Sequence, residues 1–180
     1  GNIIVKGVEA AGQALWNFGA STIDAATESQ NIGSQLDAVL KSTGGAAGMT
    51  KDAILGLSDS LSKMTPYEDD AITKGESLML TFTNIGSDVF PDATKTMLDM
   101  STALGQDVSQ SAMQLGKALN DPVQGVTALR RVGVQLTDAQ QAQVDAMVKV
   151  GDTAGAQKVI LQELQKEFGG SAQAAGETFA

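Results

Sequence analysis

Signals for the start of a helix recur along this 180-residue chain and constrain its fold more than any other feature. The strongest of them is a capping box, in which a Ser, Thr or Asp residue precedes Glu or Gln by three positions. Such boxes are predicted at Thr65–Glu68, Asp107–Gln110, Asp121–Gln124 and Thr137–Gln140. All three prolines, at positions 66, 91 and 122, stand where a helix would begin. Apolar residues follow these starts at a spacing of 3.6, and no run alternates as strands do, so the sequence predicts an all-α fold.

The expected architecture is an irregular bundle or array of about seven to eight short helices behind an N-terminal helical arm. Residues 1–30 are the arm, which is glycine-diluted and expected to pack weakly. Residues 31–170 are expected to form a compact helical domain, and residues 171–180 a low-complexity tail. One helix is predicted to start at Thr65-Pro66 and to continue to Ile85.

The stretch from Gly116 to Gly133 is the most punctuated segment of the chain. Asp121 is a predicted N-cap, and Pro122 occupies the first helical position. Gly133 suits the left-handed residue that ends a helix. The segment therefore predicts a helix end, a sharp corner, a short helix of about two and a half turns and a second corner.

Composition excludes several kinds of chemistry. The chain has no cysteine and no histidine, which removes disulfides, thiolate or imidazole metal ligands, and serine triads that use histidine. The net charge of −9 and the scattered lysines argue against binding of nucleic acid or of an anionic membrane. No run of 18 apolar residues occurs, so no transmembrane segment is predicted. We expect no catalytic residue, no metal site and no cofactor.

Three side chains are candidates for a contact with a partner. Arg130 and Arg131 are the only arginines, and a guanidinium group suits a phosphate or a carboxylate. The alternative is structural: a contact with the helix dipole, or an ion pair with Asp121 or a neighbouring helix. Trp16, beside Phe18 in the arm, could touch a partner or a membrane, or could simply pin the arm in place.

Several motifs resemble the tail length tape-measure proteins of tailed bacteriophages and prophages. The likeness rests on LDAVLKSTGG at 36–45, on LTFTNIG at 80–86 with the Val89-Phe90-Pro91 run, and above all on LGKALNDP at 115–122. It continues through LRRVGV at 129–134 and Leu136-Thr137, and then through the pairs at 151–152 and 156–157 to FGGSA at 168–172. It covers roughly residues 32–172, whereas the arm shares only a general composition.

The resemblance implies a structural, non-enzymatic role. Proteins of this family are long, mostly helical chains that occupy the tail tube, set its length during assembly and help deliver the genome. It implies contacts with tail-tube, tail-tip and chaperone proteins, self-association as a further option, and a place in the virion tail and, during assembly, in the host cytoplasm. Two alternatives stay open: a fragment of a peptidoglycan hydrolase that uses a carboxylate pair, and a helical adaptor module. Because each helix is about 10–12 Å across, a bundle fits poorly in a narrow tube, and we expect marginal stability or reversible opening.

Overall fold

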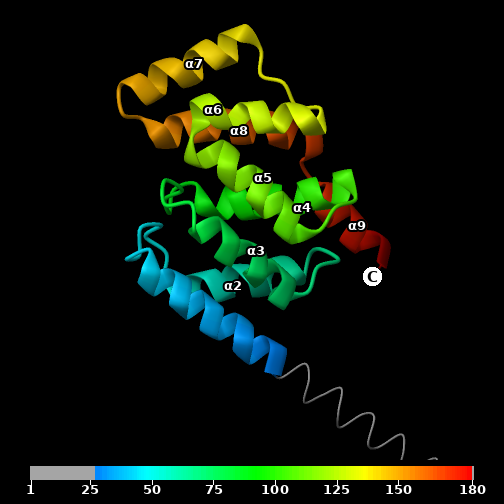
Figure 1. Ribbon diagram of the computed structural model, residues 1–180. Helices are drawn as coiled ribbons and strands as arrows, with labels where there is room; N and C mark the ends of the chain where they lie inside the picture. The colour runs from blue at the N-terminus through cyan, green and yellow to red at the C-terminus, as the bar shows by residue number, and fades with distance from the viewer. Residues whose placement is uncertain (1–26, 180) are drawn as a thin grey trace, which may run out of the picture. The chain divides into compact units, whose positions relative to one another are not determined.

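The computed structural model describes residues 27–179, and helices connected by short turns account for them (Figure 1). Residues 27–42 are helical, and the chain divides into two compact units between residues 35 and 36. The larger unit, residues 36–180, contains one 3₁₀ turn, η1 (Arg130–Val132), and eight helices: α2 (Lys51–Ser62), α3 (Asp69–Leu80), α4 (Phe90–Leu104), α5 (Val108–Asn120), α6 (Pro122–Leu129), α7 (Asp138–Lys149), α8 (Thr153–Phe168) and α9 (Ser171–Phe179). No strand occurs within residues 27–179, and the all-α prediction is confirmed.

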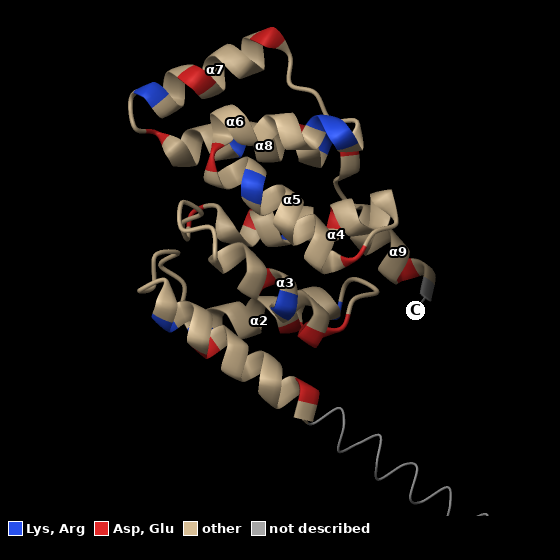
Figure 2. Cartoon of the chain, in the orientation of Figure 1, with Lys and Arg blue, Asp and Glu red and all other residues tan. Residues whose placement is uncertain are grey.

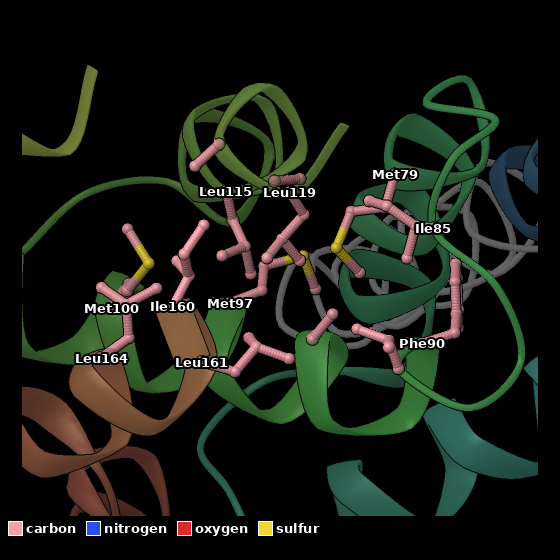
Figure 3. Close-up of a cluster of buried hydrophobic side chains, with 14 of the residues drawn as sticks. Met79, Ile85, Phe90, Met97, Met100, Leu115, Leu119, Ile160, Leu161 and Leu164 are labelled. Atoms are coloured by element: carbon pink, nitrogen blue, oxygen red, sulfur yellow. The ribbon is translucent and has the colours of Figure 1, made fainter. Parts of the chain in front are cut away.

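Four helices supply most of the core. Side chains from α3, α4, α5 and α8 point toward one another in Figure 3, together with Ile85 from the turn after α3. Three of them are methionines, whose flexible side chains fill gaps in a chain that is only 4% aromatic. The fully or almost fully buried members are Met79, Ile85, Phe90, Met97, Met100, Leu115, Leu119, Ile160, Leu161 and Leu164. Helix α2 packs on α3, and α7 lies at the edge of the unit against α6 and α8 (Figure 1).

Most helices begin where the sequence predicts. The side chain of Asp107 accepts a hydrogen bond from the backbone amide of Ser109 at 2.7 Å, and Asp152 accepts from that of Gly155 at 2.9 Å. Thr137 caps α7 and closes the only complete capping box among the described helices, with the side chain of Gln140 accepting from its backbone amide. The other predicted boxes are therefore single caps or, in one case, absent.

The prediction for the Thr65–Glu68 box is wrong. Helix α3 begins at Asp69, and its N-cap, Glu68, makes no side-chain capping hydrogen bond. The hydroxyl of Thr65 instead donates to the carbonyl of Leu61 at 2.8 Å, which stabilises the end of α2. The expected continuation of this helix to Ile85 is also wrong. Helix α3 ends at Leu80, where the Thr81 hydroxyl donates to the Leu78 carbonyl at 2.6 Å.

Helix α9 occupies the segment for which the sequence predicts a low-complexity tail. It packs against α4 (Figure 1), and the side chain of Asp99 on α4 hydrogen-bonds its start. The two carboxylate oxygens of Asp99 accept hydrogen bonds from the backbone amides of Gly170 at 3.2 Å and Ala172 at 2.9 Å. A cap supplied from another helix leaves no local signal, which is why the sequence did not reveal this helix.

Candidate functional site

The corner between α5 and α6 is built as the sequence predicts. Helix α5 ends at Asn120, and the side chain of Asp121 accepts a hydrogen bond from the backbone amide of Gln124 at 3.2 Å. Pro122 lies at the first position of α6, and Gly133 ends the following 3₁₀ turn with a φ of 87°. Local chemistry therefore sets the end of α5 and the start of α6.

Two glycines allow the close packing at this corner. A Cβ atom at Gly116 would overlap the ring of Phe82, and one at Gly125 would overlap the backbone carbonyl oxygen of Lys117. At Gly125 the obstacle is backbone, which cannot rotate away as a side chain can. Helix α6 thus approaches α5 to backbone contact, and a larger residue at position 125 would push the two helices apart.

The side chain of Gln157 on α8 joins this corner to the turn after α3. Its Nε2 donates to the carbonyl of Leu119 at 2.9 Å and to the carbonyl of Asn84 at 2.7 Å. Asn84 in turn donates through Nδ2 to the Asn120 carbonyl at 2.8 Å. These bonds satisfy carbonyls at the end of α5 that have no partner within the helix. The sequence offered a signal that we did not use: Gln157 is polar, yet it shares the spacing of the apolar residues Ile160 and Leu164.

A second buried polar group lies among α2, α3 and α4. The Glu76 side chain has no exposed surface, and the Ser58 hydroxyl oxygen of α2 lies 2.5 Å from its Oε2 in a hydrogen bond. The Thr94 hydroxyl of α4 lies 3.4 Å from Oε1, and the Thr73 hydroxyl donates to Ser58 at 2.8 Å. We define Ser58, Thr73, Glu76 and Thr94 as the Glu76 cluster. Its signal in the sequence was likewise a polar residue four positions after Ile72 on an apolar face.

Burial sets the chemistry of this carboxyl group. Desolvation raises the pKa of Glu76 to about 8, and the hydrogen bonds from Ser58 and Thr94 offset only part of that rise. No cation contributes to the shift. The folded protein therefore holds Glu76 in its neutral, protonated form near pH 7.

Arg130 and Arg131 are both exposed at the C-terminal end of α6, within the basic segment that follows this helix in Figure 2. Of the two predicted structural alternatives, an ion pair with Asp121 or a neighbouring helix does not occur, because within residues 27–179 the ion pairs join Lys51 to Asp37 and Lys63 to Asp59. The other alternative, a contact with the helix dipole, is compatible with the position of both arginines directly after α6. Both guanidinium groups are thus available to a partner. Trp16, the third predicted contact residue, lies outside the described residues.

One groove, of about 490 Å³, lies between the end of α2, helix α4 and the start of α9. Asp92, Lys95 and Asp99 line it, so two carboxyl groups share this groove, which bears on the carboxylate-pair alternative. Asp99 nevertheless uses both oxygens to cap α9, which gives this carboxylate a structural task. Among residues 27–179, no three potential ligands from His, Cys, Asp and Glu come together as a metal site. None of the helices in this range is long and apolar enough to cross a membrane.

The fold and its polar contacts define a helical structural domain, in which buried polar side chains position helix ends. Residues 3–145 match the family model described as prophage tail length tape measure protein. The chain therefore belongs to the prophage tail length tape measure protein family, whose members are structural components of phage tails. The suspected resemblance is confirmed.

The matched range differs from the range in which the sequence showed its likeness. It includes residues 3–31, where only a general composition was evident, and it ends inside α7. The motifs at 151–172, which we counted in the resemblance, lie beyond it. No curated protein and no solved structure shows significant similarity to the chain.

Proposed function

We propose that this chain contributes a non-enzymatic structural domain to a tape measure protein that helps to set tail length. In this role it acts in the virion tail, and in the host cytoplasm during assembly, through contacts with tail-tube, tail-tip and chaperone proteins. The family match is the observation that carries the proposal. The all-helical fold within residues 27–179 supports it, because proteins of this family are expected to be mostly helical chains.

An in-frame deletion of residues 36–180 from the protein in its prophage tests the role in tail length. These 145 residues would span about 220 Å as one continuous helix, at about 1.5 Å per residue. We expect electron micrographs to show tails shortened by up to about this distance. Shortening near the full value would indicate an extended segment in the tail, and a smaller decrease would indicate a folded one. Tails of unchanged length would contradict the role in setting length.

We propose further that Arg130 and Arg131 contact a carboxylate-bearing surface of another tail protein. Their exposure and their lack of internal ion pairs within residues 27–179 support this role. The double variant Arg130→Ala/Arg131→Ala should lower the yield of assembled tails while leaving the circular dichroism spectrum unchanged. Lys149→Ala/Lys158→Ala is the matched control, since it removes the same charge from two exposed positions. Equal yields from both double variants would contradict a specific contact.

The arm at residues 1–30 is proposed as a second contact segment. Trp16 is the only tryptophan in the chain, so its fluorescence reports on the arm once the emission of the added protein is subtracted. Addition of purified tail-tube protein should shift its emission to shorter wavelength. An unchanged spectrum at saturating tube protein would count against this contact.

A further inference from the structure

The Glu76 cluster joins three helices through hydroxyl groups alone. Ser58 comes from α2, Thr73 and Glu76 from α3, and Thr94 from α4, and each of these side chains is buried. Such a carboxyl group is far less costly to bury when neutral than when ionised. The packing of α2 on α3 and of α3 on α4 is therefore coupled to the protonation of the Glu76 carboxyl group.

The hydroxyls of the cluster can satisfy a neutral carboxyl group completely. A protonated Glu76 can donate to Ser58 Oγ across the 2.5 Å that separates the two oxygens, while the Ser58 hydroxyl donates to the Ile54 carbonyl at 3.3 Å. The Thr94 hydroxyl has its own alternative acceptor, the Phe90 carbonyl at 3.0 Å. When the carboxyl group ionises, the Ser58 proton must turn toward it, and the negative charge remains buried without a cation.

Charged side chains on the three helices do not compensate this charge. Lys51 pairs with Asp37, Asp59 pairs with Lys63, and Asp99 caps α9. Burial and the hydroxyls of Ser58 and Thr94 account for the raised pKa of Glu76, and no charged group is among the causes. The charged groups on α2, α3 and α4, and on α5, which also packs on α3, are Lys51, Asp52, Asp59, Asp69, Asp70, Lys74, Asp92, Lys95, Asp99 and Lys117.

We propose that Glu76 is a proton-controlled latch: α2 stays packed on α3 and α4 while the carboxyl group is neutral, and this interface opens when the group ionises. The latch concerns opening of the folded domain and does not depend on the proposed role in tail length. It would let a compact unit convert to a longer form as the surrounding pH rises.

The direction of the pH effect follows from the two states. Glu76 has a pKa of about 8 in the folded protein and an ordinary value of 4.5 when exposed. Between these values the unfolded chain has lost the proton that the folded chain retains, so stability falls as pH rises. Because the chain has no histidine and no cysteine, no side chain with an ordinary pKa titrates between pH 6 and pH 8. The α-amino group of a chain also titrates in this window, so a change is assigned to Glu76 by comparison with the Glu76→Gln variant.

Carboxyl-carbon NMR of the 180-residue chain tests the latch directly. The Glu76 signal should titrate well above pH 6, and amide protection in α2, corrected for intrinsic exchange, should fall over the same pH range. The fall should be on the order of 10- to 100-fold between pH 6 and pH 8.5. Titration of Glu76 in the range of an ordinary glutamate would overturn the proposal. So would a high titration with unchanged α2 protection.

Glu76→Gln provides the matched variant, because an amide keeps the shape of the side chain and never ionises. Its urea midpoint should be equal at pH 6 and pH 8.5, whereas that of the wild type should decrease. Glu68→Gln is the control on the same helix: it removes one exposed carboxyl group and should retain the wild-type decrease. A pH response in Glu76→Gln equal to that of the wild type would overturn the latch. If Glu76→Gln does not fold, the NMR titration of the wild type still tests the latch.

Discussion

Glu76 and Gln157 are both completely buried polar side chains on apolar helix faces, yet their surroundings differ. Gln157 donates to two backbone carbonyls, which are fixed acceptors, and it joins α8 to the end of α5 and the turn at Asn84. Glu76 meets hydroxyls, which can rotate and either donate or accept. The corner around Gln157 therefore has one stable hydrogen-bond arrangement. The Glu76 cluster has two possible hydrogen-bond arrangements, and the protonation state of Glu76 determines which one forms.

This difference separates a fixed part of the domain from an adjustable one. Gln157 cannot ionise, so the packing of α5 and α8 should be insensitive to pH. Its Oε1 has no hydrogen-bond partner within the described residues. Burial of this oxygen therefore costs desolvation free energy, which the two bonds from Nε2 must offset. Opening at the Glu76 cluster would leave the α5–α6–α8 corner intact. Such partial opening would be the reversible opening that we expect from the geometry of a narrow tube.

Gln157→Glu should have the largest effect, because it places an ionisable group where only acceptors are present. An ionised carboxylate cannot donate to the carbonyls of Leu119 and Asn84, whereas the protonated form can donate to one of them. We expect a loss of about 4 kcal/mol at pH 8 and of about 2 kcal/mol at pH 5, measured by urea unfolding. Gln157→Leu removes both bonds and should cost the same at both pH values. A pH-independent loss for Gln157→Glu would mean that the corner can rearrange as the Glu76 cluster does.

Gly125→Ala should have the next largest effect and should leave the pH response of the latch in place. The new methyl group would meet the Lys117 carbonyl and the Cα of Ala118, so α6 must move away from α5. We expect a loss of about 3 kcal/mol in unfolding experiments. Gly133→Ala is the control in the same stretch: its Cβ meets open space, and the positive φ should cost only about 1 kcal/mol. Equal losses for the two variants would contradict backbone contact as the cause.

Arg130→Lys/Arg131→Lys should have the smallest effect on stability. Neither guanidinium group makes an ion pair within residues 27–179. The free energy of unfolding should therefore change by less than about 0.5 kcal/mol, with a correspondingly small shift in the melting temperature. A larger loss, measured by thermal unfolding, would show that the pair supports the corner from within. Unchanged stability with impaired tail assembly would instead support contact with a partner.

The sequence by itself determined the features that depend on neighbouring residues. The 3.6-residue spacing predicted helices, and Asp121 with Pro122 and Gly133 predicted the corner, because caps and φ restrictions act within one turn of the chain. The family was also evident from its motifs. Where two local roles competed, local reasoning failed: Thr65 could end α2 or start α3, and both choices satisfy one hydrogen bond.

Only the tertiary structure decided which polar side chains are buried and what they bind. Glu76 meets Ser58 and Thr94, each 18 positions away, and Gln157 meets Asn84 across 73 positions. Asp99 caps a helix that begins more than 70 positions later. Periodicity places a polar residue on an apolar face, but its partners depend on how helices distant in the sequence pack together. The chain's fold class is thus a local property, whereas the complete burial of Glu76, and the pH response that we propose for it, arise from packing.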